Sequence, residues 1–331
     1  MRILCCLIVM SLMVMPLLAG CSSGDTTNGT GQTQTSGSTD TPKVVIGTMI
    51  TEDFLPMWVA EKEGVFTQEG IDVQLVTFQS AQELTTALTA GEIDMAMTDP
   101  FVAATLTAGG TPVTLEWVTL GETPQQGRFG IMASPDSGVK TLKDLAGKPI
   151  GVASNTMLEY LMDNLMEQAG VPDDQIVKEE IKKIPVRYEM MTSNQVAAAV
   201  LPASLLNLGE KTGMVLVADD TQGPKNLSQS VMVARNDFAA TEAGQQAIAL
   251  VQASWDKAAQ MVNDNGAAYR DLLVEKASLP DVIAADYPIS DYPMAKRPTS
   301  EMIDPELAWM LAKGYLDKPM TYDPNTGEYQ Q

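Results

Sequence analysis

The segment from residue 43 to residue 99 constrains the fold most, because short apolar runs alternate there with stretches of helical spacing. Ser80 and Glu83 stand at capping-box spacing, and Gly64 and Gly91 are typical helix C-terminal stops. The predicted elements are, in order, a strand at 44–46, a helix at 56–63, a strand at 71–76, a helix ending at Gly91 and a strand at 93–97. This is a βαβαβ unit, in which we expect parallel strands and right-handed crossovers.

Polar side chains gather where the strands of this unit end. Ligands of open α/β sheets collect outside the carboxyl ends of the strands, where helix N-termini present free backbone N–H groups. Taken singly, each of these hydroxyls or carboxylates is equally consistent with an ordinary helix cap. Their shared sheet edge makes them a candidate binding site as a group: Thr48, Met49, Thr51, Ser80, Thr98 and Asp99.

Composition narrows the function. The 331 residues are enough for two domains, and a hydrophobic fraction of 45% is typical of globular proteins. With 42 acidic and 21 basic residues the formal charge is -21, which disfavours nucleic acid as a partner. The chain has no His, the commonest general base and transition-metal ligand. We therefore expect no metal, no cofactor and no catalytic residue.

The N-terminus indicates export and lipid attachment. An apolar run over residues 3–18 follows Met1-Arg2 and is short for a spanning helix, so residues 1–20 are predicted to be a signal peptide. The sequence Leu-Ala-Gly-Cys ending at Cys21 resembles the bacterial lipobox, which implies cleavage and diacylation of Cys21; an uncleaved anchor is the alternative. Residues 21–42 then form a lipidated cysteine and a polar, flexible tether.

A second series of strand and helix patterns begins after the Pro- and Gly-containing stretch at 121–127. Its predicted strands are 129–133, 150–153, 180–184, 197–201, a buried strand at 214–218, and 230–234, which leads out of this lobe. Its predicted helices are 157–169, 186–192 and 205–211. The remaining chain is nearly all helical and is expected to pack on the first lobe. The predicted lobes are therefore 43–125 with 235–331, and 126–234.

Several stretches of this chain resemble one family of proteins. The stretches are Leu55–Phe66, Glu69–Val73, Ala87–Asp94, Leu142–Val152 and Ala197–Pro202. They are similar to the nitrate/sulfonate/taurine and thiamine-precursor class of ABC-importer substrate-binding proteins, over roughly residues 43 to 320. The resemblance implies an α/β, type II periplasmic-binding-protein fold with two lobes, a hinge and a ligand cleft between the lobes. Two departures, Ala203 after the late proline and Asn194–Ala197 ahead of it, prevent the transfer of a ligand from any one relative.

The resemblance also implies which loops oppose each other across the cleft. The first-lobe loops would face Ser154, Asn155 and Thr156, and also Pro202 and Ser204, which supply hydroxyls, amides and helix N-termini.

Three larger side chains near the expected cleft are further candidates. Trp58 would stack on a ring, or else pack in the core. Arg128 and Arg187 would pair with a sulfonate or carboxylate of the ligand, or else form ordinary salt bridges.

The function expected from these features is an extracytoplasmic solute-binding lipoprotein, anchored through Cys21 at the cell surface or in a periplasm. It would capture a sulfonate-like anion or a pyrimidine-like heterocycle and deliver it to an ABC permease. One alternative is a binding module with a sensor or adhesion role. Another is an enzyme on the same fold; the related pyrimidine-phosphate synthases rely on Cys and His, and after cleavage this chain keeps only the lipidated Cys21 and no His.

Overall fold

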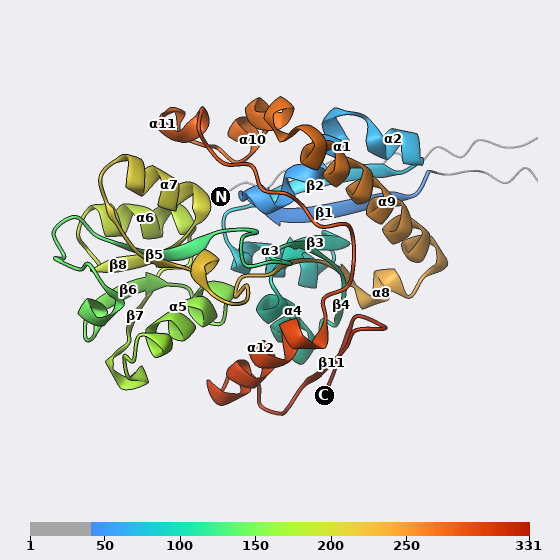
Figure 1. Cartoon of the computed structure of the whole chain (residues 1–331). Helices are drawn as coiled ribbons and strands as arrows, with labels where there is room; N and C mark the ends of the chain where they lie inside the picture. The colour runs from blue at the N-terminus through green and yellow to red at the C-terminus, as the bar shows by residue number, and fades with distance from the viewer. Residues whose placement is uncertain (1–40) are drawn as a thin grey trace, which may run out of the picture. The chain divides into compact units, whose positions relative to one another are not determined.

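A computed structural model describes residues 41–331 of the chain (Figure 1). The predicted signal peptide, Cys21 and all but two residues of the predicted tether lie outside the described residues, so their predictions remain untested by the structure. Within the described part, no helix combines the length and the apolar character needed to cross a membrane.

The first sheet contains the βαβαβ unit predicted from the sequence. It has seven strands in the order β11-β12-β4-β10-β3-β1-β2. Their bounds are β1 Lys43–Met49, β2 Asp72–Phe78, β3 Met95–Thr98, β4 Val113–Leu120, β10 Ser230–Arg235, β11 Thr321–Asp323 and β12 Glu328–Gln330. Strand β1 pairs in parallel with both β2 and β3, which confirms the parallel prediction.

The second sheet is built by the second series of patterns. It has five strands in the order β7-β6-β8-β5-β9. Their bounds are β5 Phe129–Ala133, β6 Pro149–Val152, β7 Val177–Glu180, β8 Ala198–Pro202 and β9 Val215–Asp219. Strand β6 is parallel to β7 and β8, whereas β5 is antiparallel to β8 and β9. The chain therefore forms two α/β lobes, as expected.

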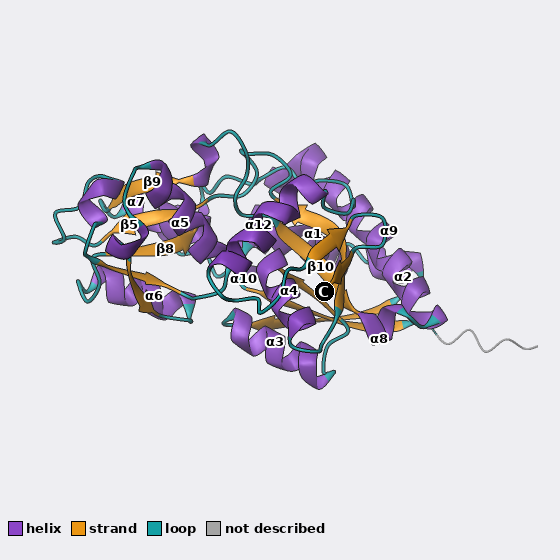
Figure 2. Ribbon diagram, turned by 90° about the horizontal axis from the view of Figure 1, so that it is seen from below, coloured by secondary structure: helices purple, strands orange, loops and turns teal. Residues whose placement is uncertain are grey.

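Helices flank both sheets (Figure 2). Those outside the second-sheet segment are α1 Leu55–Lys62, α2 Val65–Glu69, α3 Ala81–Ala90, α4 Pro100–Ala108, α8 Asn236–Ala239, α9 Glu242–Asn265, α10 Arg270–Lys276, α11 Asp281–Ala284 and α12 Ser300–Ala312. Those within it are α5 Met157–Gln168, α6 Ile184–Thr192 and α7 Ala203–Lys211. Short 3₁₀ helices lie at Glu52–Phe54, Leu142–Leu145, Asp173–Gln175, Asp220–Gln222 and Gly266–Tyr269.

Helix starts follow the predicted capping chemistry. The Ser80 hydroxyl accepts a hydrogen bond from the Glu83 N–H at 3.3 Å, which opens α3, and Asp99 caps α4 ahead of Pro100. Thr141 and Asp144 form a reciprocal capping box. Each side chain satisfies N–H groups that have no partner inside the helix, so these boundaries were readable from local sequence.

Three strand predictions in the second half were wrong. The predicted strand at 180–184 shares only residue 180 with β7, and α6 begins at Ile184. Strand β10 lies between β4 and β3 in the first sheet, so the chain returns to that sheet before Ser230 rather than after residue 234. Strand β9, predicted as buried, is half exposed because it is the edge strand of its sheet. An apolar run does not reveal whether its strand is central or at an edge.

The C-terminal hairpin of β11 and β12 was not predicted at all. These two strands have three residues each and little apolar periodicity, and they pair with each other through Tyr322 and Tyr329. The hairpin joins the first sheet through a single register pair, Glu328 with Thr114 of β4. The predicted helical tail therefore ends in strands that extend the first sheet.

The first sheet buries apolar residues on both faces. Met232 and Ala234 of β10 pack into one core with α1, α9 and α10, whereas the alternate residues Val231 and Val233 pack into another with α3, α4 and α12. This alternation is the period of two expected of a strand. The core that contains Val231 and Val233 continues into the other lobe through Phe101. The centroid of its ring lies 5.0 Å from that of the Tyr160 ring.

Two connections join the lobes, residues 121–128 and 220–229. They are bonded to each other, because the Asn226 amide donates to the carbonyl oxygens of Thr123 and Gln126 at 3.2 and 2.9 Å. Gly121 has φ 94°, a backbone conformation that favours glycine, and an added Cβ there would meet the Asn226 side chain at 2.9 Å. The two connections form one ordered junction, the expected place for a hinge.

Candidate functional site

A cleft lies between the lobes at the strand ends identified from the sequence. It encloses about 60 Å³, room for a few water-sized groups in this conformation. Its first-lobe wall comes from Met49, Thr51, Asp53, Ser80, Ala81, Met97, Thr98, Asp99 and Ser230. Its second-lobe wall comes from Phe129, Ala153, Thr156, Met157, Leu158, Lys182, Ile184 and Arg187.

Seven of the predicted residues line this cleft. They are Met49, Thr51, Ser80, Thr98, Asp99, Thr156 and Arg187. Two more, Ser154 and Asn155, lie beside it in a wider hollow of about 300 Å³ that shares Ser80, Thr156 and Lys182 with the cleft. We define this hollow as the mouth of the cleft. The sequence-based grouping of strand ends therefore brought together residues that do share one space.

The mouth is crossed by direct contacts between the lobes. Asn155 has φ 56°, a left-handed conformation that Asn tolerates, and its amide donates to the Thr105 hydroxyl of α4 at 2.7 Å. Lys183 pairs with Glu83 of α3 at 2.9 Å. Opening the cleft requires these contacts to break, so they are part of the closed arrangement.

Two predicted residues of the first lobe do not reach the cleft. Thr48 is fully buried within β1, and its hydroxyl donates to the carbonyl oxygen of Met49 at 3.0 Å. Trp58 is packed in the core, where its ring meets that of Phe54 edge to face at 5.7 Å. The rotation of α1 points Trp58 toward α9 and the sheet, so the core alternative for this tryptophan is the correct one.

Three predicted residues of the second lobe also lie outside the cleft. Pro202 is the last residue of β8, in register with Phe129, and Ser204 is half-buried in the first turn of α7. Arg128 binds Asp219 through Nε at 2.7 Å and the two carboxylate oxygens of Glu210 at 2.9 and 3.1 Å. These two acids raise the pKa of Arg128 and hold its guanidinium within the second lobe.

Arg187 does line the cleft, but its guanidinium is engaged. Its side chain is 1% exposed and donates to the carbonyl oxygens of Ile181 and Val200 at 2.8 to 3.0 Å. Burial lowers the pKa of Arg187 to about 10, and the nearby charge of Glu180 opposes this shift. Arg187 forms no ion pair among the described residues, so the salt-bridge alternative does not describe this arrangement, and its pairing with a ligand stays a prediction.

Asp53 is one of three polar cleft residues that the sequence did not suggest; the others are Lys182 and Ser230. Asp53 lies in the 3₁₀ helix that directly follows β1, is 3% exposed, and accepts a hydrogen bond from the Ser230 hydroxyl. Its neighbour Glu52 is also buried, and burial together with the charge of Asp53 raises the pKa of Glu52 to about 7. The available signal was a pair of acids between a strand end and the apolar run that starts at Phe54.

Asp99 connects the two lobes at the cleft floor. One carboxylate oxygen accepts from the Val102 N–H of α4 at 2.8 Å, and the other accepts from the Met157 N–H at the start of α5 at 3.4 Å. Burial raises the pKa of Asp99 to about 6, although these backbone hydrogen bonds act in the opposite direction. A single side chain thus caps helices of both lobes.

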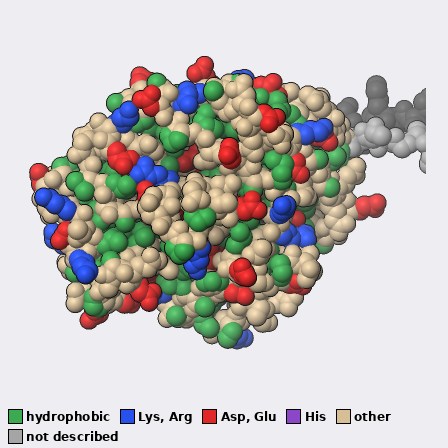
Figure 3. Space-filling view, viewed as in Figure 1, with side chains coloured by type: hydrophobic (Ala, Val, Ile, Leu, Met, Phe, Trp, Pro, Cys, Tyr) green, Lys and Arg blue, Asp and Glu red, His purple; other side chains and the backbone are tan. Residues whose placement is uncertain are grey.

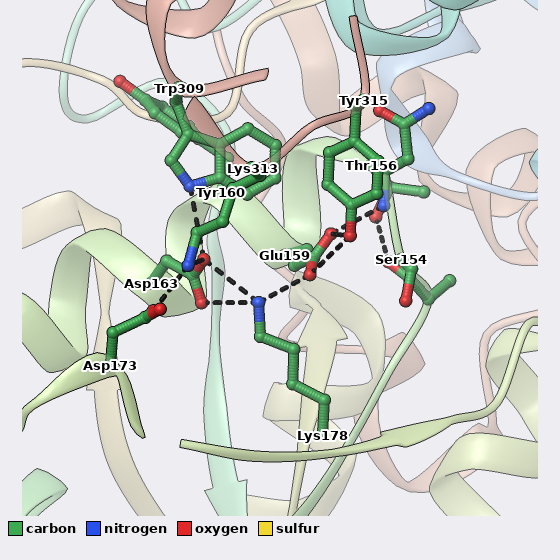
Figure 4. A network of polar contacts seen from close by, with 12 residues as sticks. Ser154, Thr156, Glu159, Tyr160, Asp163, Asp173, Lys178, Trp309, Lys313 and Tyr315 are labelled. Carbon is green, nitrogen blue, oxygen red and sulfur yellow. Dashed lines mark hydrogen bonds and ion pairs between the residues drawn. The ribbon is translucent and has the colours of Figure 1, made fainter. Parts of the chain in front are cut away.

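A polar network links the mouth to the C-terminal segment (Figure 4). The Glu159 carboxylate accepts from the Asn155 N–H at 2.6 Å and from the Tyr315 hydroxyl at 2.8 and 3.0 Å. Lys178 bridges Glu159 and Asp163 at 2.5 and 3.0 Å. The backbone turn that presents Asn155 to the cleft is therefore held by a side chain that also binds the other lobe.

The same network continues through Asp163. Lys313 binds Asp163 at 3.0 Å, and the Trp309 indole N–H donates to it at 3.2 Å. Both partners come from the end of α12 in the chain's last segment, whereas Asp163 lies on α5. We call the whole set the interlobe network: Asn155, Glu159, Asp163, Lys178, Trp309, Lys313 and Tyr315.

The described residues hold no group of three or more Cys, Asp or Glu side chains arranged to bind a metal ion.

Known proteins with related sequences cover much of this chain. The family model described as NMT1/THI5 like matches residues 51–265, more than half of the chain. A Brucella abortus protein, described only as a candidate binding protein, is 27% identical over 229 residues, which are 67% of this chain and 68% of that protein. A 4-amino-5-hydroxymethyl-2-methylpyrimidine phosphate synthase of Schizosaccharomyces pombe is 27% identical over 121 residues, 36% of this chain and 34% of the synthase.

Solved structures share the fold at low sequence identity. The alkanesulfonate-binding protein of Xanthomonas axonopodis pv. citri, bound to MOPS, has a TM-score of 0.71 at 17% identity and covers 84% of this chain and 95% of its own. The periplasmic nitrate-binding protein of Synechocystis PCC 6803 has a TM-score of 0.71 at 13% identity and covers 87% and 84%. These likenesses confirm the predicted type II periplasmic-binding-protein fold.

Proposed function

The chain belongs to the NMT1/THI5-like family, and from that premise we propose that it is an extracytoplasmic solute-binding lipoprotein that delivers a small polar or anionic organic solute to an ABC importer. The observation that carries the proposal is the cleft between the two lobes, with polar strand ends on one wall and the start of α5 on the other. Such a cleft lets a solute contact both lobes at once.

Closure about the junction of the two connections is the proposed mechanism. In this conformation Asp99, Asn155 and the interlobe network already join the lobes across the cleft. The free volume of about 60 Å³ is too small for most organic solutes to enter without movement of a wall. Solute entry therefore requires the lobes to separate, and closure around the solute gives the permease a distinct shape to recognise.

Lipid attachment is proposed from the lipobox-like sequence at Cys21. The acyl chains would hold the protein at the membrane, and the tether would let the folded part reach a permease. The surface suits this setting: on the face drawn in Figure 3, acidic and basic side chains are interspersed without a broad basic patch. Cys21→Ser should abolish acylation and release the protein from the membrane fraction; unchanged fractionation would contradict lipid attachment.

The identity of the solute can be determined directly. Native mass spectrometry of the purified protein should reveal a co-purified small molecule, and calorimetry on sulfonates, pyrimidines, carboxylates and oxyanions should rank the classes. Thr98→Ala and Asn155→Ala should both weaken binding without unfolding the protein. Scattering should show compaction on binding. Unchanged affinity in both variants would move the solute site away from the cleft, and no compaction would remove closure from the mechanism.

A further inference from the structure

The first-lobe wall of the cleft contains two hydrogen-bonding atoms that nothing in the described residues satisfies. They are Asp53 Oδ1 and Thr98 Oγ1, both on side chains that are 3% exposed or less. A buried acceptor without a donor costs about 1 to 3 kcal/mol, so each such atom calls for a partner such as a water molecule, an ion or a ligand. Both residues line the cleft.

The two atoms belong to one part of that wall. Ser230 donates to the other carboxylate oxygen of Asp53, and the next residue, Val231, is the register partner of Thr98. Successive residues of a strand point to opposite faces, so the register of β10 alone does not bring the side chains of Asp53 and Thr98 together. Both line the same cleft of about 60 Å³, and there one small group of a solute can approach them.

The charge around Asp53 favours a cation at this point. Glu52 and Asp53 are both buried, and neither forms an ion pair with any Lys or Arg of the described residues. Burial raises the pKa of both acids. The groups that face these two acids are the hydroxyls of Thr51, Ser230, Tyr287 and Tyr292. A buried carboxylate without a counter-charge is costly, and a cation brought by the solute would remove that cost.

Several backbone donors that would bind an anion are already occupied, whereas Lys182 on the second-lobe wall is an exposed cation that lines the cleft. The N–H groups at the starts of α4 and α5 donate to Asp99, and the Asn155 N–H donates to Glu159. Arg187 donates to backbone carbonyl oxygens. An oxyanion entering this cleft would compete with carboxylates of the chain itself for the same donors.

We propose that the solute carries a protonated nitrogen group, an ammonium or an amidinium, which donates hydrogen bonds to Asp53 Oδ1 and Thr98 Oγ1. This rests on the proposed function, because it takes the cleft as the solute site. Arg187 lies on the second-lobe wall and has only N–H donors. The other end of the solute should therefore carry acceptor atoms. Of the two solute classes expected from the sequence, a simple sulfonate does not fit the first-lobe wall, because it has no N–H group to donate to Asp53 and Thr98.

Calorimetry on the full chain with probes matched in size and opposite in charge tests the inference. The pairs are benzamidine with benzenesulfonate, and acetamidine with methanesulfonate. We expect the amidines to bind and the sulfonates not to bind. Asp53→Asn should weaken benzamidine at least tenfold, and the isosteric Thr98→Val should weaken it severalfold. Asp256→Asn, the same change at a half-buried acid of α9 away from the cleft wall and the two connections, is the matched control and should leave affinity unchanged.

A proton readout separates charge pairing from a mere change of shape. Burial raises the pKa of Asp53 and a cation beside it acts in the opposite direction, so binding should release protons in the pH range where Asp53 titrates, and there the binding heat should differ between buffers of different ionisation enthalpy. That difference should disappear in Asp53→Asn, and circular dichroism should show that this variant and Thr98→Val are folded.

The possible failures are distinct. If the sulfonates bind instead and Thr98→Val weakens them, the inference is wrong and the cleft remains the solute site. If benzamidine binds equally to wild type, Asp53→Asn and Thr98→Val, both the inference and the cleft as solute site are contradicted. If neither amidine binds, the inference is overturned as well.

Discussion

Asp99→Asn should remove a pH dependence of stability that the native fold imposes on this one carboxyl. Asp99 is buried at the cleft floor, and burial raises its pKa from 3.8 to about 6. A group whose pKa is raised by folding stabilises the fold fully below its unfolded pKa, and that contribution is lost as pH rises through the folded pKa. The window for Asp99 therefore runs from about pH 4 to pH 6.

The size of the effect follows from the shift. A change from 3.8 to about 6 corresponds to about 3 kcal/mol at 1.36 kcal/mol per pKa unit. The stability difference between wild type and Asp99→Asn should therefore change by about 3 kcal/mol between pH 4 and pH 7, to the disadvantage of wild type. Asn still caps α4 well, so the variant should fold. Part of this pH dependence is shared with Glu306. Burial raises the pKa of Glu306 well above its usual value, and the charge of Asp99 raises it further.

Urea unfolding followed by tryptophan fluorescence gives the free energy at each pH. Asp174→Asn, which removes an exposed carboxyl, is the surface control and should run parallel to wild type. Buried acids that do not interact with Asp99 titrate in the same way in both proteins and cancel in the difference. If the Asp99→Asn and wild-type curves are parallel from pH 4 to pH 7, the argument that burial outweighs the helix-capping hydrogen bonds at Asp99 is refuted.

Three further substitutions test other parts of the structure. Tyr315→Phe removes the hydroxyl that donates to Glu159 across the lobes, and should lower the free energy of unfolding by about 1 to 2 kcal/mol. It should also speed solute release in stopped-flow traces, and an unchanged release rate would exclude this contact from closure. Trp58→Phe should lower the melting temperature but not solute affinity, since the ring is in the core; a tenfold loss of affinity would contradict that placement. Gly130→Ala brings a Cβ to 2.5 Å from the Ala218 carbonyl oxygen, so it should lower the free energy of unfolding by roughly 1 to 3 kcal/mol and lower the melting temperature. An unchanged melting temperature would show that β9 can shift to make room.

The sequence by itself determined the order of elements and most of their boundaries. Caps such as Ser80 and Asp99 act within one helical turn, and the apolar period of a strand or helix is likewise local, so neighbouring residues carry the signal. The same locality placed polar strand ends on one sheet edge. It gave no information on the sheet position of β9 or β10, because central and edge strands differ only in what lies beside them.

Only the tertiary structure decided which polar residues meet in the cleft. Arg128 is held by acids 82 and 91 residues away, and Asp99 reaches an N–H that is 58 residues away. Such partners are chosen by helix rotation and lobe contact, neither of which has a local signature. For the same reason Asp53 appeared in the sequence only as an acid after a strand, whereas folding buries it beside Ser230 with one carboxylate oxygen that accepts no hydrogen bond from the described residues.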